Sequence, residues 1–371
     1  MFDPDREPPH PLVGTLIGGY QVVRKVAEGG MGVILEAKHP SLGQRAAVKV
    51  LSDELVSDPN YKEFYLRFVN EAKAIGLIQH PGIVKVFDQG QLANGTAFIL
   101  MEYLDGESLA QRISRGKSRP DGTWIPVPSV LRIARQLASA LAEAHRKSIV
   151  HRDLKPGNVF LVPDPEAPGG ERTKLLDFGL ARFLDAGQKI SRTGTQMGTP
   201  LYMSPEQCMG EKVDGKTDVY ALGAMMFEML SGRPPFNGPA SAIIVQHVNA
   251  PTPNLAEQCP AIPRDIQGLV ERLLQKDAKR RPTMLQLLDQ LRQLERAHPA
   301  TDPSDYDASI PTDPTRMLSD IGSTNEAATR ITPPKNTASL GLFKKMWKLL
   351  FAAAMATILV TAVLFLMKLI K

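Results

Sequence analysis

The sequence predicts an α+β fold of two lobes, in which a small sheet with one helix precedes a larger, mainly helical region. Between Tyr20 and Met101, five runs have the length and residue content of strands, and one segment has helical spacing. From about Ser108 onward, apolar residues recur at helical intervals. A separate apolar segment near the C-terminus predicts a single transmembrane helix. The length of 371 residues accommodates one two-lobed domain with additional segments.

The elements of both lobes can be placed along the chain. In the first lobe we expect strands at 20–27, 32–38, 44–51, 84–91 and 97–101, and a helix at 64–77. In the second lobe, one buried helical face is indicated by Val130, Ile133, Ala134, Leu137, Ala138 and Leu141. Two short strands are expected at 159–162 and 174–176. The polar stretch 163–172 between them, which contains Pro and Gly, predicts a surface turn.

Composition divides the chain into four parts. Residues 1–19 form a Pro-containing leader, and residues 20–295 form the folded domain. Residues 296–342 are rich in Ser, Thr and Pro and predict a flexible juxtamembrane linker. In the tail, 343–371, the uncharged run 349–367 would make a helix of about 28 Å, close to the thickness of a bilayer core. The alternative for this run is a buried helix of a soluble core.

Charge and cysteine content exclude some functions. The net charge is +5, and much of the basic excess lies beside the apolar tail, so nucleic acid is not an expected partner. Three lysines before the tail helix predict that the folded domain faces the cytoplasm, and they would attract anionic membrane lipid. Cys208 and Cys259 have no ligand spacing and are expected to be reduced thiols. The N-terminal residues lack the apolar core of a signal peptide.

Two short motifs carry the chemistry. The string HRDLKPGN at 151–158 is followed by DFG at 177–179. Asp153 can accept a proton from a hydroxyl group, and Lys155 can neutralise the charge of a phosphate. Asn158 and Asp177 offer hard oxygen ligands, which suit Mg²⁺. Together these residue types equip a site to transfer a phosphoryl group.

A Gly-rich string and a lysine precede these motifs. The string AEGGMGVI at 27–34 lies between two strand-like runs, and its glycines would let backbone N–H groups approach phosphate oxygens. In isolation such a string is also compatible with a hairpin that binds nothing. Lys49 lies in an otherwise apolar strand, so it should be paired. Glu71, on the following helix, is the expected partner.

These motifs, in this order, resemble those of eukaryotic-like (Hanks-type) serine/threonine protein kinases of bacteria, over residues 20–295. The resemblance implies a bilobal protein-kinase fold with an antiparallel sheet in the first lobe. It implies ATP and Mg²⁺, or Mn²⁺, as cofactors. Asp153, Lys155, Asn158 and Lys49 would be catalytic, and Asn158 and Asp177 would hold the metal. The nucleotide would contact Val26, Ala27, Glu28, Gly29, Gly30, Met31, Gly32, Val33, Ile34, Ala47, Lys49, Glu71, Met101, Glu102 and Tyr103.

The sequence departs from the kinase pattern at two positions of the Gly-rich string. Ala27 replaces the usual first glycine, and Ile34 replaces the usual valine. We expect nucleotide binding to survive both, because Ala27 removes only some backbone freedom and Ile34 still offers an apolar cover for adenine. Met101 would take the gatekeeper position at the hinge between the lobes.

The resemblance also implies structural roles downstream. The string GTPLYMSPE at 198–206 would form the platform on which a protein substrate docks. Glu206 would form a buried ion pair with Arg281, and Asp218 would brace the backbone of the catalytic loop. The activation segment contains Ser191, Thr193, Thr195 and Thr199, and an arginine at 152 could pair with a phosphate added there. We expect autophosphorylation at Thr193 or Thr195.

The expected function is ATP-dependent phosphorylation of Ser/Thr hydroxyls of proteins by a membrane-tethered enzyme, with autophosphorylation between two copies as a homodimer. Two alternatives remain. One is a pseudokinase that acts as a membrane-bound scaffold. The other is a small-molecule or lipid kinase, against which the platform at 198–206 argues.

Overall fold

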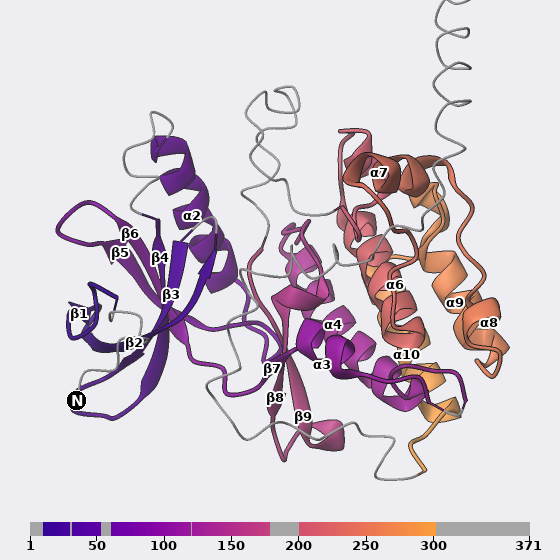
Figure 1. Ribbon diagram of the computed structural model, residues 1–371, viewed down its shortest axis with the longest axis horizontal. Helices are drawn as coiled ribbons and strands as arrows, with labels where there is room; N and C mark the ends of the chain where they lie inside the picture. Colours follow the sequence, from indigo (N-terminus) through magenta and orange to yellow (C-terminus); the bar gives the residue numbers. More distant parts are fainter. Residues whose placement is uncertain (1–9, 30–31, 53–60, 120, 179–199, 302–371) are drawn as a thin grey trace, which may run out of the picture. The chain divides into compact units, whose positions relative to one another are not determined.

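The computed structural model describes residues 10–29, 32–52, 61–119, 121–178 and 200–301. Its first lobe is a six-stranded sheet with the strand order β1-β2-β3-β4-β6-β5, and every neighbouring pair of strands is antiparallel (Figure 1). The strands are β1 (Leu16–Ile17), β2 (Tyr20–Gly29), β3 (Gly32–Lys38), β4 (Arg45–Leu51), β5 (Val86–Gln91) and β6 (Ala97–Glu102). The predicted antiparallel sheet with one accompanying helix, α2 (Tyr61–Gly76), is confirmed.

The sheet buries both of its faces, because successive strand residues point to opposite sides. In β4, Val48 and Val50 belong to the apolar cluster on one face, together with Leu35 and Leu100. Leu51 belongs to the cluster on the other face, which also contains residues of α2. Lys49 shares this second face by its register, so it lies on the side of the sheet that α2 covers.

One strand of the sheet lies within the predicted leader. Leu16 and Ile17 form β1 and pair with Gln21 and Tyr20 of β2. The side chain of Ile17 is buried in the first-lobe core. A two-residue strand leaves too little alternation for its pattern to be recognised in the sequence.

The second lobe is mainly helical, as predicted, and α4 (Val127–Arg146) is its longest described helix. The six residues expected to form its apolar stripe are all buried. Helices α6 and α10 pack against it (Figure 1). The other helices are α3 (Leu109–Arg115), α5 (Pro205–Cys208), α6 (Gly215–Ser231), α7 (Ala240–Asn249), α8 (Leu255–Gln258), α9 (Arg264–Leu273) and α10 (Met284–Ala297), with short 3₁₀ turns η1 (Pro156–Asn158), η2 (Pro168–Gly170) and η5 (Ala278–Arg280).

The prediction of a surface turn over 163–172 is wrong at its end. A small sheet of β7 (Glu107–Ser108), β8 (Val159–Pro163) and β9 (Glu171–Leu175) begins its last strand at Glu171, which is only 2% exposed. The Glu171 carboxylate accepts bonds from Arg112 Nη2 at 2.6 Å and Arg132 Nη2 at 3.0 Å. The burial of Glu171 could not be predicted from the sequence, because a buried glutamate is recognisable only through its partners.

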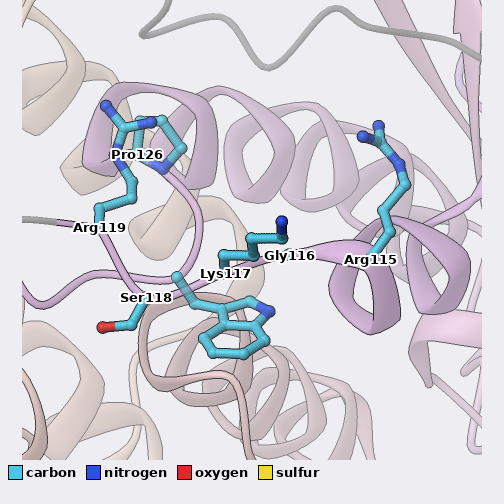
Figure 2. Close-up of a pocket in the computed structure, with 7 residues that line it drawn as sticks. Arg115, Gly116, Lys117, Ser118, Arg119 and Pro126 are labelled. Carbon is cyan, nitrogen blue, oxygen red and sulfur yellow. The ribbon is translucent and has the colours of Figure 1, made fainter.

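A loop between α3 and α4 is fastened to the end of α6. The backbone N–H groups of Trp124 and Ile125 donate to the carbonyls of Leu230 and Met229 at 2.8 and 2.9 Å. The Trp124 indole Nε1–H donates to the Ile113 carbonyl at 2.7 Å. A methyl group on Gly116 would lie 2.2 Å from that nitrogen, so the indole packs where only glycine fits. The loop borders a pocket (Figure 2).

Several predicted segments lie outside the described residues. These are Gly30, Met31, the sites at Ser191, Thr193, Thr195 and Thr199, most of the linker and the whole tail from 343 to 371. Within the described ranges, no helix combines the length and apolar character needed to cross a membrane.

We predict that Glu171→Ala lowers the free energy of unfolding by about 3–5 kcal/mol, because two buried arginines lose the carboxylate that they share. Glu166→Ala, in the exposed part of the same turn, should change it by less than about 0.5 kcal/mol. Denaturant titration of both variants would measure the difference. Equal stabilities would show that the ion pairs contribute nothing.

Candidate active site

A buried carboxylate of α6 fixes the loop that carries the HRD motif. Asp218 accepts hydrogen bonds from the backbone N–H groups of His151 and Arg152, each at 2.9 Å. His145 Nε2, at the end of α4, lies 2.7 Å from the same carboxylate. Burial disfavours the charge of Asp218, but the bond to His145 and the positive surroundings outweigh it and lower its pKa. The predicted bracing role of Asp218 is therefore confirmed.

The same loop is held from two other directions. Gln207, on α5, donates through Nε2 to the carbonyl of Arg152 at 2.8 Å, and Arg152 itself has a left-handed backbone with φ of 67°. The His151 ring lies 2.9 Å from the carbonyl of Leu176 and 4.7 Å, between ring centroids, from Phe178. Phe178 is fully buried in the second-lobe core. The HRD and DFG motifs are thus joined by direct contact.

Three predicted catalytic residues meet at the end of this loop. Lys155 Nζ lies 3.0 Å from Asp153 Oδ2. The Asn158 amide donates to the carbonyl of Asp153 at 2.8 Å and to its carboxylate at 3.2 Å. The side chain of Asp153 keeps 17% of its surface exposed, so an acceptor hydroxyl could reach the carboxylate.

Lys49 joins the two lobes electrostatically. Its Nζ lies 3.4 Å from Glu71 Oε1 and 2.8 Å from Asp177 Oδ1. Burial opposes the lysine charge, but the two carboxylates outweigh burial and raise its pKa. The predicted Lys49–Glu71 pair is confirmed, and the closer contact with Asp177 adds to it. The role of Lys49 toward phosphate stays a prediction.

The two carboxylates beside Lys49 differ. Burial raises the pKa of Glu71, and the nearby charge of Asp177 acts in the same direction. For Asp177, attraction to Lys49 and Lys155 overcomes the effect of burial and lowers the pKa. Asp177 is therefore the carboxylate that keeps its negative charge. Its side chain is 37% exposed, whereas that of Glu71 is 9% exposed.

The donor set fits a magnesium ion that also binds phosphate oxygens. Asn158 uses its amide hydrogens on Asp153, so its carbonyl oxygen is the atom left for a metal, and Asp177 supplies an anionic oxygen. Among the described residues, no group of three or more His, Cys, Asp or Glu side chains could hold a metal by itself. A protein typically supplies only a few oxygen ligands to a Mg²⁺ ion that also binds a nucleotide.

The described residues of the Gly-rich string lie in β2 and β3, where Gly29 is opposite Gly32. A side chain on Gly32 would put its Cβ 1.9 Å from the carbonyl oxygen of Val50, and φ of Gly32 is 148°, so this position requires glycine. Ala27, which replaces the usual glycine, is buried in β2 opposite Ile34. Its methyl group is therefore accommodated inside the lobe. Glu28 is exposed and pairs with Lys25 at 3.1 Å.

Register separates the predicted nucleotide contacts into two groups. Ile34 is opposite Lys49, and Ala47 is opposite Met101, so these four side chains share one face of the sheet. Val33 lies on the other face and is buried in the first-lobe core. A contact of Val33 with a nucleotide could only come from its backbone. Val26 is partly buried in β2.

The predicted hinge is held by side chains from both lobes. Glu102 Oε1 accepts from the Lys85 backbone N–H and from Lys174 Nζ, both at 2.7 Å. The guanidinium carbon of Arg45 lies 3.8 Å from the centroid of the Tyr103 ring. Lys174, on β9, has no motif around it, so its contact with the hinge could not be predicted from the sequence.

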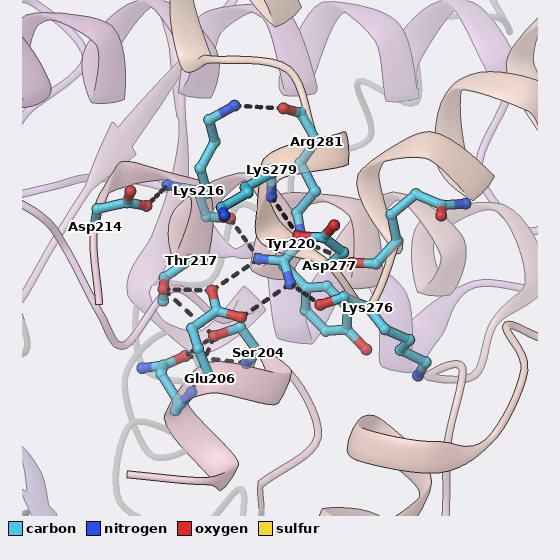
Figure 3. A network of polar contacts seen from close by, with 12 residues as sticks. Ser204, Glu206, Asp214, Lys216, Thr217, Tyr220, Lys276, Asp277, Lys279 and Arg281 are labelled. Atoms are coloured by element: carbon cyan, nitrogen blue, oxygen red, sulfur yellow. Dashed lines mark hydrogen bonds and ion pairs between the residues drawn. The ribbon is translucent and has the colours of Figure 1, made fainter. Parts of the chain in front are cut away.

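The substrate platform contains a buried ion pair (Figure 3). Arg281 Nη1 and Nη2 donate to the two carboxylate oxygens of Glu206 at 2.8 and 2.9 Å. Thr217 Oγ1 also donates to Glu206 at 2.8 Å. Arg281 further donates to the carbonyls of Gln275, Lys216 and Lys276. The predicted Glu206–Arg281 pair is confirmed, and attraction to Arg281 lowers the pKa of Glu206 against the effect of burial.

Ser204, which stands where alanine is commoner in kinases, has a structural role. It caps α5, accepting from the backbone N–H of Gln207, while the Gln207 side chain accepts from the backbone N–H of Ser204. The spacing Ser-x-x-Gln is the signature of a capping box. This signal was present in the sequence. Gln207 then also reaches the catalytic loop through its bond to Arg152.

Comparison with known proteins places this site in a family. Residues 20–291 match the family described as Protein kinase domain. The chain belongs to the protein kinase family. A kinase relative, serine/threonine-protein kinase pkn2 of Myxococcus xanthus, is 39% identical over 273 residues, which are 72% of this chain and 31% of that protein. Serine/threonine-protein kinase PknA of Mycobacterium tuberculosis is 38% identical over 273 residues, 72% of this chain and 59% of that protein.

Solved kinase structures agree with the fold. The crystal structure of the PknI kinase domain of Mycobacterium tuberculosis matches with a TM-score of 0.57 and 28% identity, covering 77% of this chain and 99% of that domain. These relatives confirm the resemblance to bacterial Hanks-type kinases. The chain spans between 31% and 59% of the length of the curated kinases named above.

A buried histidine supports the kinase platform from α7. His247 Nδ1 lies 2.9 Å from the Tyr220 hydroxyl, and Nε2 lies 3.2 Å from the carbonyl of Leu201. Burial lowers the pKa of His247 to about 4, and the charge of Lys276 acts in the same direction. The neutral ring is thus part of the folded structure.

We predict that His247 makes stability depend on pH. Its pKa is lower in the folded state than in the unfolded state, so the unfolded state binds the additional proton and stability falls as pH drops below about 6.5. Between pH 7.5 and 5.5 this group should remove about 1 kcal/mol. Denaturant titrations at both pH values should show a smaller pH effect in His247→Asn. An identical pH effect in the variant would refute the assignment.

Proposed function

We propose that this chain is an ATP-dependent protein serine/threonine kinase. The observation that carries the proposal is the arrangement of two sets of residues. In the first set, Lys49 contacts Glu71 and Asp177. In the second set, Asp153 contacts Lys155 and Asn158. The first set offers charges for a nucleotide, and the second offers a proton acceptor and a cation. Each set is held in place by residues that are buried in the lobes.

The acceptor side of the reaction depends on Asp153. Its carboxylate, held by Lys155 and Asn158, would accept a hydrogen bond from the substrate hydroxyl and then its proton. The new O–P bond forms as the bond between the γ-phosphorus and the oxygen of the leaving ADP breaks. Lys155 Nζ would neutralise charge on the transferring group. Because these side chains are already oriented by the protein, little reorganisation is needed in the transition state.

The nucleotide side depends on Lys49. Its ammonium group would hold the α- and β-phosphates, with Glu71 as the orienting partner. When bound, Mg²⁺ would neutralise phosphate charge, and Asn158 and Asp177 are the residues that would hold it. Asp177, the carboxylate of this group that keeps its negative charge, favours a cation beside it.

A protein acceptor is favoured over a small molecule by the platform around Glu206. The ion pair with Arg281 and the cap at Ser204 fix residues 200–208 next to the catalytic loop. The lysine two positions after Asp153 is typical of kinases that act on Ser and Thr.

We predict that Asp153→Asn lowers kcat by about 100-fold or more, because an amide cannot accept the hydroxyl proton. The control Asp289→Asn, on the exposed face of α10, should keep wild-type activity. Transfer of labelled phosphate from ATP to a mixed protein substrate, at matched Tm, would measure both. A folded wild-type protein that transfers no phosphate would instead support the pseudokinase scaffold.

We further propose that the kinase is tethered to a membrane by residues 343–371, with its domain in the cytoplasm where ATP is found. The support is the sequence alone: the uncharged run 349–367 and the lysines at 344, 345 and 348. Confinement to a membrane raises the local concentration of copies and would promote autophosphorylation in trans at the activation segment.

The tether can be tested by a chain that ends at residue 342. We expect the full chain to float with lipid vesicles and the shortened chain to remain in the soluble fraction. At matched low concentration, the shortened chain should autophosphorylate more slowly, as phosphopeptide mapping over time would show. Equal flotation would remove the anchor from the proposal, and equal autophosphorylation would remove the effect of confinement.

A further inference from the structure

A basic pocket lies apart from the active site, at the junction of α3 and α4. It has a volume of about 340 Å³ and is lined by Arg115, Gly116, Lys117, Ser118, Arg119, Trp124 and Pro126. Figure 2 shows Arg115 and Arg119 at opposite ends, with Lys117 between them. A volume of this size is at the lower end of small-ligand sites.

The cations of this pocket are poorly matched by carboxylates. Among the described residues, neither Lys117 nor Arg119 forms an ion pair, and Arg119 Nε is shielded from solvent without a hydrogen-bond acceptor. Arg115 pairs with Glu107 at 2.7 Å, but Glu107 also serves the buried Arg112 at 2.6 Å. An unmatched guanidinium nitrogen that is shielded from water is stabilised by an added anion.

No carboxylate is among the described residues that line the pocket. The loop that carries Arg119 contains Asp121, whose Oδ1 accepts from the backbone and the hydroxyl of Thr123 and does not contact the cations. The backbone of Arg119 is fixed by bonds to Thr123 and Gly122, so its position does not depend on a ligand. The pocket is therefore a preformed site with excess positive charge.

We infer that this pocket binds the phosphate group of a phosphorylated Ser or Thr in a peptide segment of a protein partner. The Arg119 guanidinium can donate to phosphate oxygens and Lys117 adds a point charge, whereas Nε and Nη2 of Arg115 already bind Glu107 at 3.0 and 2.7 Å. Trp124 and Pro126 offer apolar surface for the carbon atoms beside the phosphate. The choice of phosphate rests on the proposed function, because a kinase produces such residues.

A peptide fits the surroundings better than a membrane surface. A membrane-binding patch combines basic residues with exposed large apolar side chains that insert among lipids. The described exposed apolar side chains, among them Leu77, Met209 and Val245, do not come from the segment 109–126. The pocket contains none of the catalytic residues, although α3, which ends at the pocket, packs against η1 of the catalytic loop.

The test is equilibrium binding of a fluorescent phosphothreonine peptide to the full chain in detergent, without ATP. Absence of nucleotide separates this result from failure of the kinase proposal. Lys117→Ala/Arg119→Ala should raise Kd by about tenfold or more, which corresponds to about 1.4 kcal/mol. The control Lys38→Ala/Arg292→Ala removes two exposed cations elsewhere and should leave Kd within about twofold.

Further binding measurements decide whether the pocket prefers a phosphopeptide or a small anion. The unphosphorylated peptide should bind at least about tenfold more weakly than the phosphorylated one. Inorganic phosphate and a soluble inositol phosphate should compete only at much higher concentrations. Equal Kd values for the wild type and the pocket variant would overturn the proposal, as would tighter binding of either small anion than of the peptide. Unchanged phosphotransfer by the pocket variant to an unphosphorylated substrate would support a docking role.

Discussion

The buried carboxylate of Asp218 is the interaction on which the active site depends. It lies on the central helix of the second lobe and binds two consecutive backbone N–H groups of the catalytic loop. Removing a buried charged acceptor leaves donors without partners, which costs more than the bond itself contributes. The position of Asp153 therefore depends on α6, although no atom of α6 takes part in the reaction. The loop needs such support because Arg152 has an unfavourable left-handed backbone.

Two buried carboxylates of the second lobe are neutralised by arginines of other elements. Glu206 of α5 meets Arg281 after η5, and Glu171 of β9 meets Arg112 of α3 and Arg132 of α4. Such pairs contribute little net stability compared with apolar packing, but a single broken partner is expensive. They consequently specify which elements may pack together. The segment around Glu206 is positioned by one such pair, and the small sheet by the two pairs of Glu171.

The sequence predicted the site well where residues act through short motifs, and poorly where they act through distant partners. Lys49, Asp153, Asn158 and Asp177 were recognisable from motifs that resemble those of kinases, and the structure places Lys49 beside Asp177 and Asn158 beside Asp153. The burial of Glu171 was missed, because nothing adjacent in the chain marks its arginine partners. The face of Val33 could be assigned only from strand register, since a β-hairpin fixes which side chains point inward. The capping role of Ser204 is visible in the sequence as Ser-x-x-Gln.

The length of α4 has a consequence for any segment that would touch both of its ends. The helix is a stiff rod of 20 residues, and an extended peptide advances only about 3.3–3.6 Å per residue. A chain spanning that rod therefore needs about nine residues between its two points of contact. The length of α4 therefore excludes such partners if their two recognised groups are separated by fewer residues than this.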